Sequence, residues 1–258
     1  MKRERVIDLN CDMGESFGRY KLGLDEEIIM YISSANIACG FHAGDPRVMR
    51  QTVELARAKG VGVGAHPGFP DLVGFGRREM RLTPEEITAD LVYQVGALRA
   101  FCSAAGVELQ HVKPHGALYN MASKDPVLAA AIVEGILAVD PSLILFCLAG
   151  SELCRVAEER GLRVAHEVFA DRAFQPDGTL LPRSQPGSII HDAKLAAERA
   201  VRMVLEGKVT AYDGTEIEVR ADTICLHGDT PTAVELARTI REEFERRGIE
   251  VRPIGGRR

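Results

Sequence analysis

The sequence predicts an α/β fold, a single-domain irregular (β/α) barrel of seven strands that is TIM-like and spans residues 1–258. Short apolar segments typical of buried strands alternate with amphipathic helical segments along the whole chain. No linker, low-complexity stretch or change of composition divides it. Seven or eight strand–helix units in one domain favour a closed barrel, and the alternative is an open doubly wound sheet.

The predicted helices carry recognisable caps. Asp45-Pro46 provides an N-cap and a favoured first residue, and Gly60 ends that helix. Thr83-Pro84-Glu85-Glu86 caps a long helix that ends near Gly106. We expect strands at 6–11, 35–41, 61–66, 109–114, 143–148, 163–169 and 223–226, and helices at 25–33, 46–59, 83–105, 125–139, 151–160, 188–206 and 230–247.

The C-terminal part contains one departure from this alternation. Two short segments, 209–212 and 216–219, flank Asp213-Gly214, a dipeptide typical of a type I′ hairpin turn. We interpret this hairpin, near 209–219, as a structural insertion. Residues 249–254 are expected to form a last strand or a tail that packs on the barrel.

Composition and charge exclude several classes of protein. The net charge of −5 and the pI near 5.9 provide no basic surface for nucleic acid. No apolar run approaches the ~18–20 residues of a membrane span, and the charged N-terminus is not a signal peptide. The six cysteines are widely spaced without a CxxC motif, so we expect reduced thiols in a cytoplasmic protein, with Cys102, Cys147 and Cys154 as buried small hydrophobic residues.

Polar side chains follow almost every predicted strand. In a parallel barrel the carboxyl ends of the strands meet at one rim, here called the C-terminal rim, where barrel enzymes keep their active sites. Six of the seven histidines are expected there, and only His191 falls on a predicted helix. Besides His166, the polar residues expected at this rim are Asp8, Asn10, Asp12, Glu15, His42, Asp45, His66, Asp71, His111, Lys113, His115, Glu167, Asp171, Arg172, His227 and Asp229.

The segment 109–120 holds two histidines and a lysine at alternate positions. Pro114 argues against a helix interior. On a strand, His111, Lys113 and His115 share one face. A buried lysine must be paired or have a lowered pKa, so Lys113 is the hardest of the three to explain as core. His111 lies deeper and fits a core histidine, whereas Lys113 and His115 lie nearer the mouth.

Alternation along the first strand sorts its side chains. Asp8, Asn10 and Asp12 share one face, and apolar residues occupy the other. The apolar face should meet the outer helices, which leaves the polar residues facing the barrel interior. Small residues at inward positions of the third strand, Gly62 and Gly64, leave room for a ligand.

Several of these residues also have a structural interpretation. Asp45 is mainly an N-cap, and Arg172 beside Asp171 is either an ion pair or a clamp for a carboxylate or phosphate. No Walker A motif, dinucleotide fingerprint or nucleophile elbow is present. A divalent metal is an open alternative, because four side chains that suit zinc or manganese come to the rim from separate strands: Asp12, His42, His66 and His115.

Seven sequence blocks carry a family resemblance. They are DLNCDMGESFG (8–18), ANIACGFHAGD (35–45), GAHPGFPD (64–71), FGRR (75–78), VKPHGALYN (112–120), EVFADR (167–172) and LHGD (226–229). Together they resemble the LamB/YcsF family over nearly the whole chain, with no departure at the polar positions. The resemblance implies a seven-stranded β/α barrel of the glycoside hydrolase/deacetylase type.

The resemblance also implies an activity, that of the ATP-dependent 5-oxoprolinase, a hydrolase that acts on a cyclic amide. The chain would serve as its A subunit, with subunits B and C as partners and ATP as cosubstrate of the complex. The substrate would be the small lactam 5-oxoproline, which is opened to L-glutamate. Two alternatives stay open: a metal-dependent amidohydrolase or deacetylase that acts alone, and a non-catalytic substrate-binding subunit of a lactam-utilising complex.

Within that activity we assign roles as hypotheses. Lys113 and Arg172 hold anionic groups, and Asp12 or His115 acts as general base for water. His42 and His66 position the activated lactam or a metal. The catalytic set is therefore Asp12, His42, Lys113 and His115, and the substrate-binding set is Asn10, Glu15, His66, Asn120, Asp171, Arg172 and His227.

Overall fold

Seven parallel strands close into a barrel in the computed structural model, which describes residues 5–226 and 232–255. Neighbouring strands follow the order β1-β2-β3-β4-β5-β6-β9, and β9 pairs with β1 to close the ring. The predicted seven-stranded barrel is confirmed. Its strands are β1 (Val6–Met13), β2 (Ser34–Ala38), β3 (Gly62–His66), β4 (Leu109–Val112), β5 (Ile144–Leu148), β6 (Arg163–Phe169) and β9 (Thr223–Leu226).

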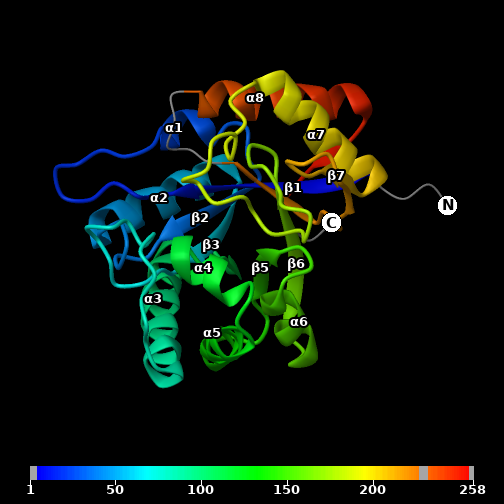
Figure 1. Ribbon diagram of the computed structural model, residues 1–258. Coiled ribbons are helices and arrows are strands. Elements are labelled where there is room, and N and C mark those ends of the chain that lie inside the picture. Colours follow the sequence, from blue (N-terminus) through cyan, green and yellow to red (C-terminus); the bar gives the residue numbers. More distant parts are fainter. Residues whose placement is uncertain (1–4, 227–231, 256–258) are drawn as a thin grey trace.

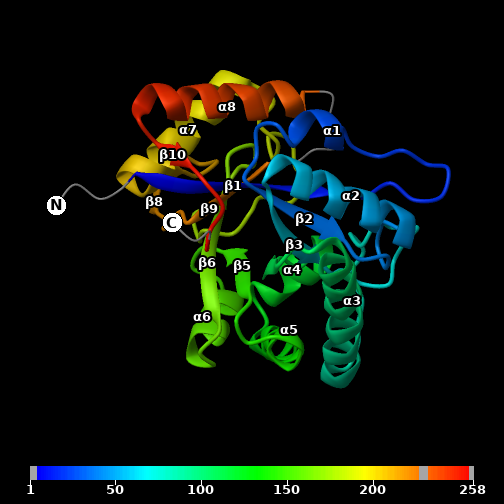
Figure 2. The same cartoon turned by 180° about the vertical axis from the view of Figure 1, so that it is seen from behind.

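Helices surround the barrel (Figures 1 and 2). Several caps are those that the sequence predicts: Asp45 accepts hydrogen bonds from two backbone N–H groups of its helix, and Thr83 and Glu86 form a capping box. None of the helices in the described ranges is long and apolar enough to cross a membrane. The longer helices are α2 (Pro46–Lys59), α3 (Pro84–Ala105), α5 (Pro126–Val139), α6 (Glu152–Glu159), α7 (Ala193–Glu206) and α8 (Ala233–Arg247).

The first helix, α1 (Asp25–Ile28), is shorter than the predicted 25–33. The helix ends early because Ser33 is hydrogen-bonded to the first strand. Its N–H donates to the carbonyl oxygen of Leu9 at 2.8 Å, and its hydroxyl donates to Asp8 at 2.6 Å.

Two further helices also differ from the prediction. α7 begins at Ala193 rather than at 188, because Asp192 caps it by accepting the N–H groups of the next turn. His191 therefore lies in the loop before the helix. A short helix that the sequence did not predict, α4 (Gly116–Ala122), directly follows the 109–115 segment.

The predicted hairpin is present, but its turn is longer than expected. β7 (Lys208–Thr210) and β8 (Glu216–Glu218) pair antiparallel, with Thr210 opposite Glu216, which leaves residues 211–215 as the connection. The turn is not a two-residue type I′ turn, because the Ala211 N–H donates to the carbonyl of Thr215 and this hydrogen bond encloses the residues 212–214. The end of the chain contributes a short strand, β10 (Glu250–Val251), which pairs with β1.

Two of the cysteines form a disulfide, which corrects the prediction of reduced thiols for that pair. Cys147 lies on β5 and Cys154 in the first turns of α6, and a disulfide joins them. The tight turn between these elements brings the two Cα atoms to 5.6 Å, within the range a disulfide requires. Their separation in the sequence carried no sign of this approach. The other cysteines, Cys11, Cys39, Cys102 and Cys225, are free and buried.

Polar side chains fill the interior of the barrel along β1. Asp8 and Asn10 point inward and bond to residues of the neighbouring strands, whereas Leu9 and Cys11 are fully buried in the outer apolar core. The predicted alternation of this strand is therefore confirmed. Because β1 runs toward the C-terminal rim, Asp8 lies deepest and Asp12 lies nearest the mouth.

The deepest polar layer is centred on Asp8. Its carboxylate accepts hydrogen bonds from the hydroxyl groups of Ser33, Ser34 and Thr223, at 2.6, 2.7 and 2.6 Å. Burial nevertheless raises the pKa of Asp8 to about 6, because these bonds do not replace its lost hydration.

This raised pKa predicts a specific pH dependence of stability. A folded-state pKa above the unfolded value favours the protonated form in the folded protein. The contribution of Asp8 is therefore fully present below pH ~4 and is lost as the pH rises through ~6. We expect the unfolding free energy of the wild type, measured by urea titration, to fall by up to about 3 kcal/mol relative to Asp8→Asn over this interval. A difference between the two proteins that does not change with pH would contradict this.

Candidate active site

Lys113 lies at the centre of a buried ionic network near the rim. Its Nζ is 3.0 Å from Oδ1 of Asp12 and 3.0 Å from Oε1 of Glu167, and it donates to Oδ1 of Asn10 at 3.2 Å. Burial lowers the pKa of Lys113, but the charges of Asp12 and Glu167 and the contact with Cys225 outweigh it and raise the pKa well above its usual value. Lys113 is therefore a buried ammonium group with ionic partners, which is one of the two options that the sequence left open.

The 109–115 segment keeps its alternation beyond the end of β4. The N–H of Lys113 donates to the carbonyl of Ala65, and that of His115 to the carbonyl of Pro67, both at 2.8 Å. The extended backbone thus carries Lys113 and His115 to the mouth of the barrel. His111 lies deeper, as predicted: its ring stacks on Phe146 with centroids 4.0 Å apart, and burial lowers its pKa to about 3.

Three buried histidines form a cluster beside Lys113. The rings of His42 and His115 are parallel, with centroids 3.8 Å apart, and His66 meets them edge-on at 5.5 and 4.8 Å. Burial, together with the neighbouring imidazoles, lowers the pKa of His42 and of His115 well below the usual value. These two rings are neutral at physiological pH.

The hydrogen bonds of the cluster leave two acceptor nitrogens, one on His66 and one on His115, facing each other when the rings are neutral. His66 Nδ1 is 2.7 Å from the carbonyl oxygen of Lys113, and His115 Nε2 is 2.8 Å from that of Phe75. A carbonyl only accepts, so both of these ring nitrogens carry hydrogen. In neutral rings, His66 Nε2 and His115 Nδ1 are then both unprotonated, yet they are 2.9 Å apart. Oδ2 of Asp12, a further acceptor, lies 3.2 Å from the same His66 nitrogen. Such an arrangement calls for a cation or a proton among these atoms.

His42 also favours a cation in this cluster. Its side chain is fully buried, yet neither of its ring nitrogens has a hydrogen-bond partner within the described ranges. One ligand atom from each of Glu15, His42, His66 and His115 lies within 4.8 Å of the others. This donor set fits zinc or manganese. It shares its histidines with the predicted set, and its carboxylate is Glu15, whereas Asp12 pairs with Lys113.

The loop 71–78, here called the apex loop, packs its inner side on this cluster. Phe75 contacts the rings of both His42 and His115, at centroid distances of 5.8 and 5.2 Å. It adopts a left-handed backbone with φ of 55°, which is strained for a phenylalanine. A Cβ on Gly76 would lie 2.7 Å from the Cβ of His42, so only glycine fits there. The loop therefore fixes the position of the cluster.

A cavity of about 640 Å³ opens above Lys113 and the histidines. Asp12, His66, Lys113 and His115 form its inner wall. Four cationic side chains, accompanied by the carboxylates of Glu79 and Asp125, line the remainder: Arg77, Lys124, Arg172 and Arg183. A cationic mouth over a buried ammonium group suits a small anionic ligand.

Two predicted substrate-binding residues lie in the loop that follows β6. Arg172 lines the cavity, and its guanidinium also donates to the carbonyls of Ser188 and Leu181, at 3.2 and 2.6 Å. Burial lowers the pKa of Arg172 to about 10, which leaves it charged. Arg172 thus orders the loop that crosses the barrel mouth. Asp171 is buried beside it, and its carbonyl accepts the N–H of Ile190.

The remaining predicted residues have different outcomes. Asn120 lines the cavity on α4 and is exposed. His227 and Asp229 lie outside the described residues. The expectation that six histidines reach the rim is wrong for His166, whose Nε2 faces Oε1 of Glu158 on α6 at 3.3 Å, outside the barrel. Strand alternation explains this, because the next residue, Glu167, points inward.

Three groups in the network were missing from the predicted site. Tyr119 donates its hydroxyl to Oε2 of Glu167 at 2.6 Å, and Lys113 Nζ is 2.9 Å from Sγ of Cys225. Strand alternation could have identified Cys225, which shares the inward face of β9 with Thr223. Glu167, at the end of a predicted strand, was expected at the rim but assigned no role.

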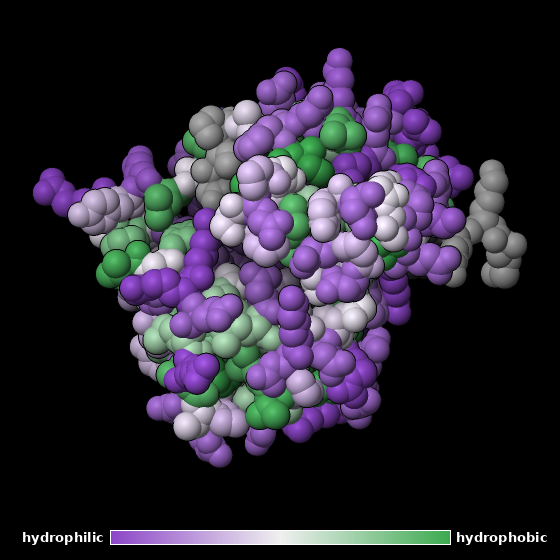
Figure 3. Space-filling model, viewed as in Figure 1, coloured by the Kyte–Doolittle hydropathy of each residue, from purple (hydrophilic) through white to green (hydrophobic). Residues whose placement is uncertain are grey.

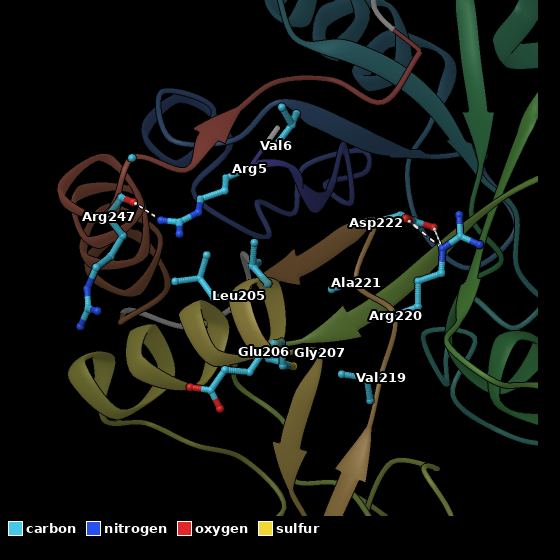
Figure 4. Close-up of a pocket in the computed structure, with 13 residues that line it drawn as sticks. Arg5, Val6, Leu205, Glu206, Gly207, Val219, Arg220, Ala221, Asp222 and Arg247 are labelled. Carbon is cyan, nitrogen blue, oxygen red and sulfur yellow. Dashed lines mark hydrogen bonds and ion pairs between the residues drawn. The ribbon is translucent and has the colours of Figure 1, made fainter. Parts of the chain in front are cut away.

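A larger hollow of about 1230 Å³ lies at the opposite end of the barrel, where α7 and α8 end and β1 begins (Figure 4). Its charged groups have other partners: Arg220 pairs with Asp222, and Arg5 donates to the carbonyl of Arg247. Arg247 and Glu206 pair with Glu243 and Arg202. None of the described residues that line it is a histidine. The C-terminal rim is therefore the better candidate for chemistry.

A closed β/α barrel with a buried lysine–carboxylate network and a histidine cluster at the carboxyl ends of its strands is the architecture of a barrel enzyme. Residues 7–258 match the LamB/YcsF family, and the chain belongs to that family.

Relatives and solved structures agree with this membership. The 5-oxoprolinase A subunit of Thermococcus onnurineus (strain NA1) is 63% identical over 249 residues, which cover 96% of this chain and 98% of that protein. The protein of the same name from Pyrococcus abyssi (strain GE5 / Orsay) is 60% identical over 248 residues, covering 96% and 97%. The crystal structure of the lactam utilization protein from Thermus thermophilus has a TM-score of 0.92 and 55% identity, and the match covers 96% of this chain and 100% of that one.

Proposed function

We propose that this chain is the A subunit of an ATP-dependent 5-oxoprolinase and binds 5-oxoproline above Lys113. Relatives with that name, 63% and 60% identical over nearly their whole length, support the proposal. The observation that carries it is the cavity itself, in which a buried ammonium group and a cationic mouth face a histidine cluster. A small lactam with one carboxylate fits this chemistry.

The substrate explains the need for ATP. A five-membered lactam is an unactivated amide. Transfer of the γ-phosphoryl group from ATP to the lactam oxygen releases ADP and activates the ring carbon. Water then adds to that carbon and the C–N bond breaks, which leaves an acyl phosphate and a free amine. A second water releases phosphate and L-glutamate. In this proposal ATP is the cosubstrate of a complex with subunits B and C, and the complex works in the cytoplasm, where ATP is available.

The residues of the chain divide this work. Lys113, with Arg172 at the cavity wall, neutralises the carboxylate or phosphoryl group of the ligand. Asp12 is held at Oδ1 by Lys113 and by the amide of Asn36, at 3.0 and 2.9 Å, and its carboxylate lines the cavity. It is therefore placed to take a proton from the attacking water, with His115 as the second candidate.

The same proposal includes a divalent metal, zinc or manganese, held by Glu15, His42, His66 and His115. Two observations support it. His66 Nε2 and His115 Nδ1, both acceptors when their rings are neutral, lie 2.9 Å apart, and the ring nitrogens of His42 have no hydrogen-bond partner among the described residues. The outer N–H groups of His66 and His115 support it as well, since they donate to backbone carbonyls as those of metal-bound histidines do. When bound, such an ion polarises a carbonyl or lowers the pKa of water.

Reconstitution with the partner subunits tests the function. We expect glutamate release from 5-oxoproline only when ATP, this chain and subunits B and C are all present, measured by coupled glutamate dehydrogenase. Release by this chain alone without ATP would instead identify a stand-alone amidohydrolase. No release from the complete mixture would contradict the proposal.

A further inference from the structure

Exposed apolar side chains gather on one sector of the C-terminal rim. The described residues include twelve large hydrophobic side chains that are exposed. Half of them lie on the loops that follow β1 and β3 and on the adjoining part of α3: Tyr20, Leu22, Leu24, Leu72, Val73 and Tyr93. Because β1, β2 and β3 are neighbours in the barrel, these loops rise from adjacent positions. Exposed apolar groups concentrated in this way are typical of an interaction surface.

The loop after β1, residues 16–24, is here called the arm. It projects from the body of the protein beyond the helices (Figures 1 and 2). The N–H of Gly18 donates to Asp45 at 2.7 Å, and Arg47 donates to the carbonyl of Gly18 at 3.1 Å. The rings of Phe17 and Tyr20 contact each other at 5.3 Å. The arm is thus held in place, yet Tyr20 stays 69% exposed.

The apex loop presents its own apolar residues outward. Val73 is 92% exposed at the outer side of the loop, whereas Phe75 and Gly76 pack on the histidine cluster from within. Asp71 braces the loop by accepting the N–H of Gly74 at 2.9 Å and by an ion pair with Arg78. A partner that contacts Val73 would therefore contact the apex loop, whose inner side positions His42 and His115.

Tyr93 connects the same surface to the site by a second route. Its ring stacks on Phe41, with centroids 5.4 Å apart, and Phe41 immediately precedes His42. The next residue of the helix, Gln94, binds both the N–H and the carbonyl of Gly68, at 2.9 and 3.0 Å, at the start of the segment that leads into the apex loop. Tyr93 and the apex loop are thus linked through the backbone at Gly68.

Within the arm, the start of α2 and the apex loop, cationic side chains outnumber carboxylates. These segments expose Arg19, Lys21, Arg47, Arg77 and Arg78. Their own carboxylates have partners, since Asp45 caps α2 and Asp71 pairs with Arg78, and the exposed carboxylates lie just outside them, at Glu26, Glu27, Glu79, Glu85 and Glu86. The whole chain has a net charge of −5. Hydrophilic side chains end the arm, and hydrophobic surface lies beside it in the space-filling view (Figure 3).

We propose that the arm, the apex loop and Tyr93 form the docking surface for a protein partner that presents an apolar patch bordered by carboxylates. The occupant is one of the two other subunits of the complex, so this inference rests on the proposed function. Tyr20, Val73 and Tyr93 are the apolar anchors, and the cations of the arm, of α2 and of the apex loop form the polar border. Docking closes one side of the cavity mouth and fixes the apex loop against the histidine cluster.

A charge placed at Val73 tests the surface. Val73→Asp should weaken binding to the B or the C subunit at least tenfold in biolayer interferometry, with an unchanged melting temperature because the side chain is almost fully exposed. Arg19→Glu should weaken the same binding and reduce its dependence on salt. Tyr212→Asp is the matched control: Tyr212 is an exposed apolar residue of the β7–β8 hairpin, outside this sector, and binding should not change.

The outcomes separate this inference from the proposed function. Wild-type binding and glutamate release with Val73→Asp and Arg19→Glu would overturn the docking surface and leave the function standing. An assembled wild-type complex that binds but releases no glutamate would overturn the function instead. Concentration-dependent self-association of the chain that is lost in Val73→Asp, while this variant still binds subunits B and C, would assign the surface to a second copy and overturn the proposal.

Discussion

Lys113→Met is expected to reduce 5-oxoproline-dependent glutamate release by the assembled complex by about 10²–10³-fold, the loss typical of removing a preorganised electrostatic group. Methionine keeps the length of the side chain and removes the ammonium group. The ligand then loses its buried counter-charge, and Asp12 and Glu167, each 3.0 Å from Nζ, lose theirs. Initial rates at saturating ATP, with subunits B and C in excess, measure the effect.

The carboxylates left unpaired in this variant could also destabilise the fold and lower activity for that reason. A second variant separates this effect from the loss of the ammonium group. Loss of one partner of a buried ion pair typically costs about 3–5 kcal/mol. Lys113→Met combined with Glu167→Gln lowers that charge imbalance, so we expect a melting temperature closer to that of the wild type and no recovery of activity. Near-normal turnover by either variant would contradict the assignment of Lys113.

Metal content is the second large effect. We expect about one zinc or manganese ion per chain in purified protein by elemental analysis, and loss of that ion in His66→Ala. The reason is geometric, since His66 Nε2 and His115 Nδ1 lie 2.9 Å apart and are both acceptors when the two rings are neutral. Chelation should lower both the melting temperature and turnover, and the added metal should restore them.

A histidine outside the cluster supplies the control for this measurement. His166 faces Glu158 outside the barrel, so His166→Ala should keep the full metal content. Metal-free wild-type protein with full activity in the complex would contradict the metal proposal. In that case a proton lies between His66 Nε2 and His115 Nδ1 in place of a metal.

Much of the fold and part of the site follow from alternation along the strands. The inward face of β1 was predicted from alternation, and for the buried amine of Lys113 the sequence left two options, an ionic partner or a lowered pKa. The wrong expectation for His166 came from treating every residue at a strand end as part of the rim. His166 and Glu167 are adjacent on the strand and therefore point to opposite faces, so an inward Glu167 places His166 outside the barrel.

Other features could not be predicted, because they depend on loop geometry. Nothing in the sequence indicates that Phe75 adopts a positive φ and packs on two histidines, or that Glu15 joins the three histidines. The disulfide between Cys147 and Cys154 likewise depends on how tightly β5 turns into α6. Such contacts arise from tertiary packing and have no periodic signal in the chain.

In the proposed function the lactam binds in the cavity above Lys113. A crystal structure of the protein with 5-oxoproline would show this position. We predict density for the ligand in the 640 Å³ cavity, with its carboxylate within hydrogen-bonding distance of a cation of the cavity wall and its ring facing His115. Density in the hollow among Arg5, Arg220 and Arg247 instead, with the cavity above Lys113 empty, would contradict the claim.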